Sequence, residues 1–225
     1  MPTDNDPDLI EARARAGRAI RDLGHAFIGR EATLAQIEHL SEVIEGVTAE
    51  LWLGGERSRD GRHEFSRQPG DVPQGRFHHT FDDRLVSGRA SPWGLEPELH
   101  RHGDEIVALV TLRSAHEGAP GRSHGGVVAA LFDDVFGSVL DIIKQAAFTG
   151  DLYIRYLAPT PLFRELQCRV RMTGRDGRRI FMTGELVDPD NDQVVVTSKA
   201  TFIAVDPAAF AKATAARPAP PDEDT

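Results

Sequence analysis

The feature that most constrains the fold is a long, nearly uncharged segment in the second half of the chain. It reads HGGVVAALFDDVFGSVLDIIKQ and covers residues 124–145. Almost every residue between positions 127 and 143 is apolar or small, which predicts a helix buried on most of its surface. An ionised carboxylate in such a helix loses its hydration and needs partners. The Asp133–Asp134 pair at its centre therefore requires an explanation.

Helical geometry separates the two carboxylates. At about 100° per residue, Asp134 lies on one stripe and Asp133 on another. The stripe of Asp134 also carries Ser138, Asp141 and Gln145, and we expect it to face solvent. The stripe expected to face the core comprises Val128, Leu131, Phe132, Val135, Val139 and Ile142. Asp134 is thus interpreted as a solvated surface acid.

Asp133 falls in a row of small residues, which leaves room for a helix or a ligand to come close. The row consists of Gly126, Ala129, Ala130 and Gly137. Asp133 is therefore the candidate functional carboxylate, and a buried acid satisfied by backbone N–H groups is the alternative.

The start of the helix supplies a second possible half of a site. Gly125 and Gly126 lie in the first turn, where backbone N–H groups have no partner within the helix. These donors and the helix dipole suit a developing oxyanion or an anionic ligand. Glycine also lets a substrate carbonyl approach the backbone closely. Together with a carboxylate further along, this arrangement favours acyl transfer or hydrolysis.

The spacing of these residues resembles a known family. His124-Gly125-Gly126, six further residues and then Asp133 resemble the PaaI-type branch of the hotdog-fold acyl-CoA thioesterases. Residues 149–159, TGDLYIRYLAP, resemble the next strand of that family, which ends in Tyr-x-x-Pro, and residues 117–121 resemble the loop before the motif. The resemblance implies an α+β hotdog fold, a long central helix wrapped by a curled antiparallel sheet, over residues 85–206.

The resemblance also implies roles for individual residues. Asp133 matches the catalytic carboxylate, acting as a general base toward water or as a nucleophile on the thioester carbonyl. Gly125 matches the oxyanion-hole N–H donor, with Gly126 beside it. His124 matches the histidine that positions this turn, and Thr149 matches a Ser/Thr position that orients the attacking water.

The expected substrate-binding residues include one departure from the family pattern. Many members carry Asn six residues before the histidine, and this chain has Gly118 there. Glu117, which is adjacent, is a candidate to replace that Asn. Arg155, together with Arg178 and Arg179, is a candidate for a basic patch that binds the phosphates of CoA.

The rest of the chain divides into recognisable segments. Residues 1–54 are expected to form a helical extension in two pieces, broken near Gly24 and Gly29. Its second piece has an apolar stripe that must pack on the main domain or on a second subunit. That stripe comprises Leu34, Ile37, Leu40, Ile44, Val47 and Leu51. Residues 55–84 are interpreted as an irregular linker, 85–206 as the hotdog domain and 207–225 as a disordered tail.

Strand patterns surround the central helix. One is expected at 105–113 and four follow at 151–157, 165–173, 179–187 and 193–205. The turns at 175–177 and 188–192 are suited to hairpins.

Composition excludes several classes of protein. The net charge of −9 argues against general nucleic-acid binding, and no apolar run reaches the length of about 20 residues needed for a membrane span. A single cysteine and an N-terminus without a signal-like pattern are typical of a cytoplasmic protein. Nothing in the sequence indicates a metal or a cofactor. In particular, the calcium-loop-like residues 188–192 lack the glycine and glutamate of an EF-hand, and the histidine pairs lack further zinc ligands.

One motif suggests a different hydrolase. Residues 121–125 satisfy G-x-S-x-G, the nucleophile elbow of serine hydrolases. That fold needs a histidine after the serine and acid, and no histidine follows His124. The residues before the motif are also a poor strand. This reading is therefore disfavoured.

Two functions follow from the resemblance. The first is hydrolysis of an acyl-CoA or acyl-carrier thioester. The second is an acyl-CoA-binding module without efficient turnover, and a hydratase is a weaker third. The resemblance also implies a homodimer or tetramer with composite sites, in which Asp133 of one subunit faces the His124-Gly125-Gly126 turn of its partner.

Overall fold

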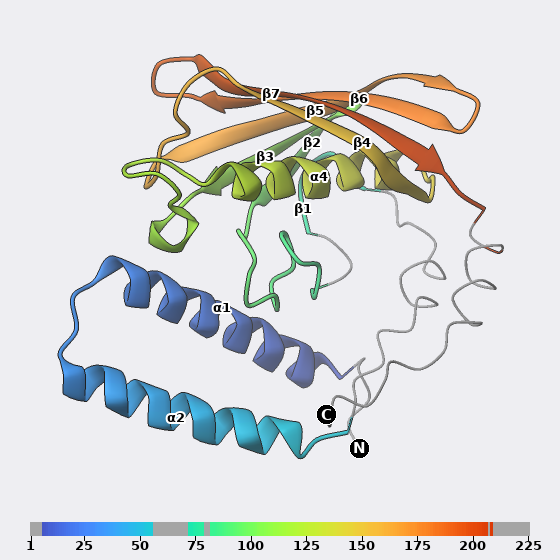
Figure 1. Cartoon of the computed structure of the whole chain (residues 1–225). Coiled ribbons are helices and arrows are strands. Elements are labelled where there is room, and N and C mark those ends of the chain that lie inside the picture. Colours follow the sequence, from blue (N-terminus) through green and yellow to red (C-terminus); the bar gives the residue numbers. More distant parts are fainter. Residues whose placement is uncertain (1–5, 56–71, 79–81, 207, 209–225) are drawn as a thin grey trace.

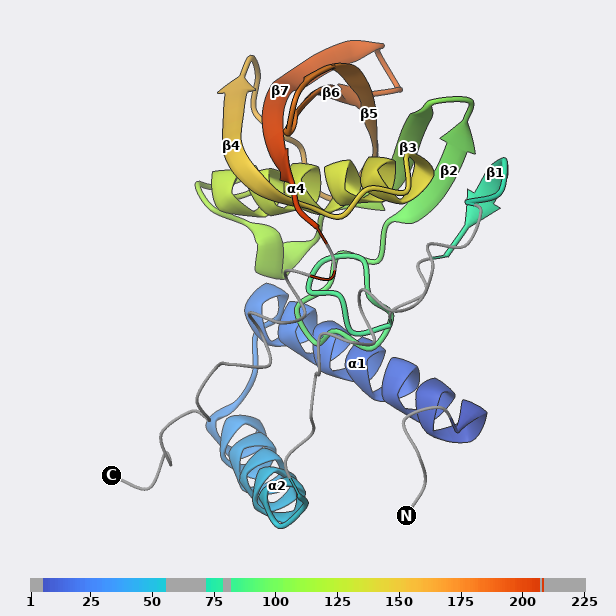
Figure 2. The ribbon, with the colours of Figure 1, turned by 90° about the vertical axis from the view of Figure 1, so that its right-hand side faces the viewer.

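A curled antiparallel sheet wraps around one long helix in the computed structural model, which describes residues 6–55, 72–78, 82–206 and 208 (Figures 1 and 2). The helix is α4 (Gly125–Ile142). The strands are β1 (Gly75–Phe77), β2 (Glu98–His102), β3 (Glu105–Thr111), β4 (Ala147–Tyr156), β5 (Glu165–Asp176), β6 (Arg179–Asp188) and β7 (Gln193–Ala204). Their order in the sheet is β1-β2-β3-β5-β6-β7-β4. The expected α+β arrangement is confirmed.

Alternation along the strands explains why the sheet lies on α4. In β7, Ser198, Ala200 and Phe202 are buried and alternate with more exposed residues. The core stripe of α4 meets this face, and Val128, Leu131, Phe132, Val135 and Val139 are all buried as predicted. Hydrophobic burial between one stripe and one sheet face therefore fixes the orientation of α4.

The opposite stripe of α4 is not solvated, so that part of the sequence interpretation is wrong. Ser138 is fully buried, and the Asp134 side chain is only 10% exposed. The Arg84 guanidinium covers Asp134 and lies 3.3 Å from its Oδ1 atom. A Cβ atom built on Gly137 would lie 2.8 Å from Arg84 Nη2, so part of the small-residue row accommodates this arginine.

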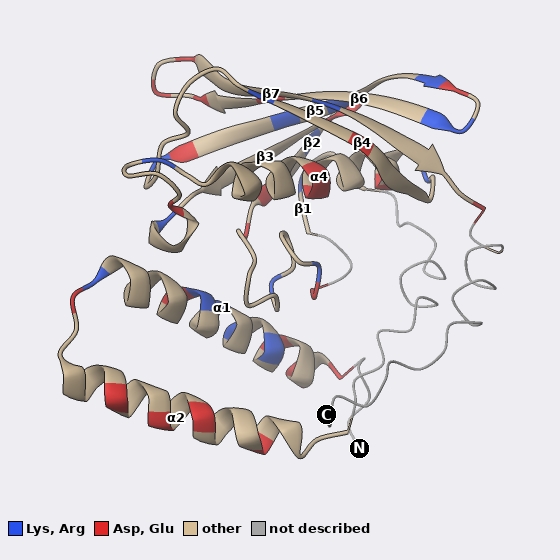
Figure 3. Ribbon diagram, in the orientation of Figure 1, with Lys and Arg blue, Asp and Glu red and all other residues tan. Residues whose placement is uncertain are grey.

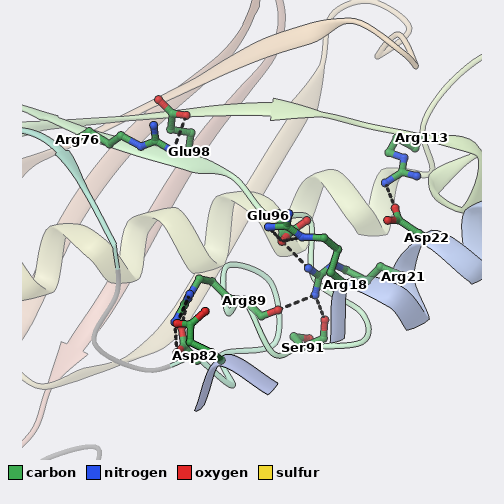
Figure 4. Close-up of polar contacts among 11 residues, drawn as sticks. Arg18, Arg21, Asp22, Arg76, Asp82, Arg89, Ser91, Glu96, Glu98 and Arg113 are labelled. Atoms are coloured by element: carbon green, nitrogen blue, oxygen red, sulfur yellow. Dashed lines mark hydrogen bonds and ion pairs between the residues drawn. The ribbon is translucent and has the colours of Figure 1, made fainter. Parts of the chain in front are cut away.

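Arg84 belongs to a segment that crosses beneath α4, here called the strap (residues 82–96). Helix α1 (Pro7–Gly29) buries a face that recurs every three or four residues, Ala14, Gly17, Arg21 and His25. The helix holds the strap from the other side through Gly17 and Arg21, whereas His25 accepts from the Ala115 N–H group beyond the strap. Arg21 donates to the Arg89 and Ser91 carbonyl oxygens and lies 2.6 Å from Glu96 (Figure 4). Gly17 is needed because a Cβ there would lie 2.5 Å from the Ala90 carbonyl oxygen.

The N-terminal helices differ from the expectation in two respects. Helix α1 continues through Gly24 and ends at Gly29, so only the second predicted break is present. Helix α2 (Leu34–Trp52) begins with a capping box between Thr33 and Gln36, but it has no buried residue. Within the described part of the chain its predicted stripe does not pack on the main domain, which leaves the second subunit as the predicted partner. Its charged side chains are all acidic (Figure 3).

Two short strands were not predicted. Strand β1 lies within the segment interpreted as an irregular linker, and β2 pairs with it and with β3. Residues 56–71 and 79–81 of that linker, and nearly all of the predicted tail at 207–225, lie outside the described residues. Within the described part of the chain, no helix is long and apolar enough to span a membrane.

Candidate active site

Asp133 lies on the exposed side of α4 and has one hydrogen-bond partner. Thr149 Oγ1 donates to Asp133 Oδ1 over 2.7 Å. Within the described ranges no other hydrogen bond reaches this carboxylate, so its second oxygen is open to solvent or to a ligand. The alternative of a buried, backbone-satisfied acid does not apply to the single chain, in which Asp133 is exposed.

A bulge in β4 aims Thr149 at α4. Thr149 pairs with Phe202 and Leu152 with Ala200, both of which face the helix, and the register shifts at the intervening Gly150. On a regular strand, residues an odd number of positions apart face opposite sides. The extra residue at the bulge therefore places the Thr149 and Leu152 side chains on the same side of β4, facing α4. Bulges often redirect a side chain in this way next to functional sites.

The first turn of α4 leaves one backbone donor unused. His124 caps the helix, and its Nδ1 atom accepts from the Gly126 N–H group over 3.0 Å. The Val127 N–H group donates to the His124 carbonyl oxygen. Among the described residues, the Gly125 N–H group has no acceptor, so it is the donor available to an oxyanion. Because Nδ1 is an acceptor, the neutral His124 ring carries its proton on Nε2.

Tyr156 was not singled out from the sequence, although it lies at the start of the Tyr-x-x-Pro likeness. Its hydroxyl group donates to the Gly125 carbonyl oxygen over 2.6 Å. Burial raises the pKa of this hydroxyl group above its ordinary value, which keeps the donor protonated. The contact therefore ties β4 to the first turn of α4.

The loop before the motif packs tightly against His124. A Cβ atom built on Gly118 would lie 2.8 Å from His124 Cα, so this position has no room for a larger residue without movement. The Glu117 carboxylate accepts from the Gly121 N–H group over 2.6 Å. Glu117, the candidate to replace the family Asn, therefore binds within its own loop. The side chain that hydrogen-bonds Asp133 is Thr149.

A pair of histidines supports this loop from α1. The 3-10 helix η1 (Ser114–His116) precedes the loop, and the His116 carbonyl oxygen accepts from the His124 N–H group over 2.8 Å. The rings of His25 and His116 meet edge to face, with centroids 4.6 Å apart. Burial lowers the pKa of His116 to about 4 and also lowers that of His25, so both rings are neutral near pH 7.

The three arginines considered for CoA do not form one patch. Arg155 pairs with Thr197 and Arg179 with Ile203, six residues further along β7, which is about 20 Å at the usual rise of a strand. Arg178 donates to the Ala204 carbonyl oxygen at that far end. Arg155 also follows the alternation of β4, so it points away from α4 whereas Tyr156 points toward it.

Other reactive groups do not add to the site. Burial raises the pKa of the Cys168 thiol, which is fully enclosed in the core and so is a poor nucleophile. Across the described ranges there is no group of three or more His, Cys, Asp or Glu residues that could hold a metal ion.

The two halves of the site are far apart within one chain. Gly125 and Asp133 are eight positions apart on α4, which is about 12 Å along a helix. An attacking water and an oxyanion donor must each lie about 3 Å from the atoms of one reacting carbonyl group. Within one chain, Gly125 and Asp133 are separated by several times this distance.

Comparisons with known proteins identify relatives of this chain. Residues 121–195 match the family model of the thioesterase superfamily. Acyl-coenzyme A thioesterase THEM4 of Mus musculus is 30% identical over 91 residues, which are 40% of this chain and 39% of that protein. THEM4 of Bos taurus is 27% identical over 133 residues, which are 58% of this chain and 52% of that protein. The chain thus spans about two-fifths to half the length of these relatives.

A solved structure resembles the chain over a longer range. The crystal structure of a thioesterase superfamily protein is 27% identical and has a TM-score of 0.70, covering 90% of this chain and 93% of that one. Because most of both chains is covered, the likeness extends beyond the matched family segment.

Proposed function

We propose that this chain, which carries a thioesterase-superfamily domain with the hotdog fold, hydrolyses an acyl-CoA or acyl-carrier thioester to a free acid and a thiol. The superfamily and the fold are those predicted from the His-Gly-Gly and Asp pattern. The proposal is carried by one observation: the chain presents an open carboxylate, Asp133, and an unused oxyanion donor, the Gly125 N–H group.

The chemistry follows from the surroundings of each group. Asp133 takes a proton from water, whose oxygen attacks the thioester carbonyl carbon. The Gly125 N–H group and the positive end of the α4 dipole stabilise the oxyanion of the tetrahedral intermediate. The carbonyl then re-forms, the carbon–sulfur bond breaks, and the thiolate takes the proton from Asp133. Thr149 holds the carboxylate in position throughout.

Direct attack by Asp133 is the other route to the same products. Its carboxylate oxygen would form an anhydride as the thiolate leaves, and water would then cleave the anhydride. The open second oxygen of Asp133 is compatible with either route.

The active unit in this proposal is a homodimer or a dimer of dimers with composite sites. The separation of about 12 Å between Gly125 and Asp133 along α4 supports a second copy as the source of one of the two groups. Strand β4 is an edge of the sheet and exposes unpaired backbone groups to a partner. Beside it, Gly126 and Asp133 on α4 are exposed and suit close approach.

The substrate class rests on the named relatives and on local charge. The Mus musculus and Bos taurus relatives are named as acyl-CoA thioesterases. Arg155 is exposed at the edge strand and stays a candidate for a phosphate contact, made around the edge of the sheet or across the dimer. A single cysteine fits the reducing cytoplasm as the compartment.

The test is thiol release from short, medium, long and aromatic acyl-CoAs by wild type and Asp133→Asn. The variant is expected to lose roughly 10²- to 10⁴-fold in kcat, the usual contribution of a general base. Asp151→Asn is the matched control, because Asp151 is an exposed carboxylate on the outer face of β4. No turnover by wild type, with acyl-CoA binding retained, would instead support the binding module.

A further inference from the structure

The structure assigns a positioning role to Tyr156: we infer that its hydroxyl group holds the turn that presents the Gly125 N–H group to the thioester oxygen. This inference rests on the proposed function, since it concerns the oxyanion half of the same site. It adds a residue on β4 that acts through Gly125 and does not itself touch the reacting atoms.

Tyr156 contacts Gly125 in two ways, through a hydrogen bond from its hydroxyl group and through close packing against the glycine. The hydroxyl group donates to the Gly125 carbonyl oxygen over 2.6 Å. A Cβ atom built on Gly125 would lie 2.8 Å from that hydroxyl oxygen and 3.2 Å from Tyr156 Cζ. The tyrosine ring therefore occupies the space a side chain would need, and glycine at position 125 is required by Tyr156 as well as by the substrate.

The contact fixes the position of the first turn of α4 relative to β4. The Gly125 carbonyl group that Tyr156 binds belongs to the peptide between Gly125 and Gly126. The Gly125 N–H group belongs to the preceding peptide, whose His124 carbonyl oxygen accepts from the Val127 N–H group. The helical hydrogen bonds therefore set the direction of the Gly125 N–H group within the turn, and Tyr156 ties that turn to the sheet.

The same strand contacts both groups that one chain contributes, Asp133 and Gly125. Thr149 binds Asp133 and Tyr156 binds Gly125, and the two β4 residues are seven positions apart. They face α4 together only because the bulge at Gly150 changes the alternation between them. Strand β4 thus orients the carboxylate with one end and the oxyanion donor with the other.

The chain provides a matched control for Tyr156. It has two tyrosines, and Tyr153 lies on the opposite face of the same strand, 60% exposed. Tyr153→Phe removes the same atom from the same strand without touching α4. We therefore compare Tyr156→Phe with Tyr153→Phe in steady-state thiol release.

Tyr156→Phe is expected to lower kcat by roughly 10- to 100-fold, less than the 10²- to 10³-fold cost of deleting an oxyanion donor outright. KM should change by less than about twofold, because the lost interaction acts in the transition state. Tyr153→Phe should match wild type. Unchanged kcat in Tyr156→Phe, or a rise confined to KM, would overturn the positioning role while leaving the proposed function intact.

A second measurement tests the contact without activity. In Tyr153→Phe the remaining tyrosine is Tyr156. Its ultraviolet tyrosinate titration should lie above the ordinary pKa of about 10, because the hydroxyl group is partly desolvated and donates to the Gly125 carbonyl oxygen. Titration at the ordinary value would show that the hydrogen bond to Gly125 is not made and would overturn the inference. Absence of turnover in wild type would count against the proposed function alone, because this titration is independent of it.

Discussion

Equimolar mixing of two inactive variants tests the composite site directly. Asp133→Asn removes the carboxylate, and Gly125→Pro removes the backbone N–H group of the oxyanion turn. Proline suits the first helical position, and His124 already has the extended backbone, φ −65° and ψ 134°, that a residue before proline adopts. A Cβ atom at position 125 would also lie 2.8 Å from the Tyr156 hydroxyl oxygen. The substitution therefore removes the N–H donor and also displaces the Tyr156 contact.

The expected gain follows from the distance between the two groups. Because about 12 Å separates them in one chain, each site in the proposed dimer takes Asp133 from one subunit and Gly125 from the other. In a mixed dimer, one site then carries both defects and the other carries neither. Random association makes about half of all dimers mixed, so about a quarter of wild-type activity should return.

The assay is thiol release after the two variants are co-expressed with different tags or unfolded and refolded together. Each variant alone sets the background. A chain that carries both substitutions, mixed with Asp133→Asn, is the control, because no pairing of these chains restores a complete site. If the mixture of single variants is no more active than the mean of its components, both groups act within one chain and the composite arrangement is wrong.

Three further predictions address the surroundings of the site. Asp134→Asn should lower the free energy of unfolding by about 2 kcal/mol in urea, because it weakens the part-buried contact with Arg84, while kcat stays near wild type; unchanged stability would contradict this. Burial lowers the pKa of His116 to about 4 in the folded chain. Between pH 6.5 and 4 the imidazole therefore takes up a proton only when the chain is unfolded. The free energy of unfolding should therefore fall by up to about 3 kcal/mol from pH 6.5 to 4, and a slope unchanged in His116→Asn would refute this origin. Gly118→Asn, which restores the family residue, should lower kcat because its Cβ would lie 2.8 Å from His124 Cα, and a faster variant would refute the packing argument.

Much of the fold was predictable because its signals are local. The apolar run at 124–145 and the alternation of the four strands after it reflect short-range periodicity, and hairpin residues such as Gly177, with φ +54°, mark the turns. Strands β1 and β2 were missed because they are short and lie among polar residues. Their pairing with β3 depends on the sheet already being present.

Local spacing predicted the candidate site where one segment contained the information, and the family resemblance added Thr149, which lies against Asp133 from β4. The first turn of α4 and Asp133 share one helix, so their spacing could be read directly. The solvated interpretation of Asp134 was wrong because Arg84, fifty positions earlier, covers it. Likewise, the role of Tyr156 depends on a one-residue bulge at Gly150, which no periodicity in β4 indicates.

The two N-terminal helices stand in different relations to the rest of the chain. Helix α1 buries four residues, pairs with the strap and supports η1, so substitutions on its inner face are transmitted to the turn that carries Gly125. Helix α2 buries none within its own chain, so its apolar stripe stays available to a second subunit. The boundary between the helix tied to the sheet of its own chain and the helix that is not therefore falls at residues 30–33, inside what the sequence presents as one extension.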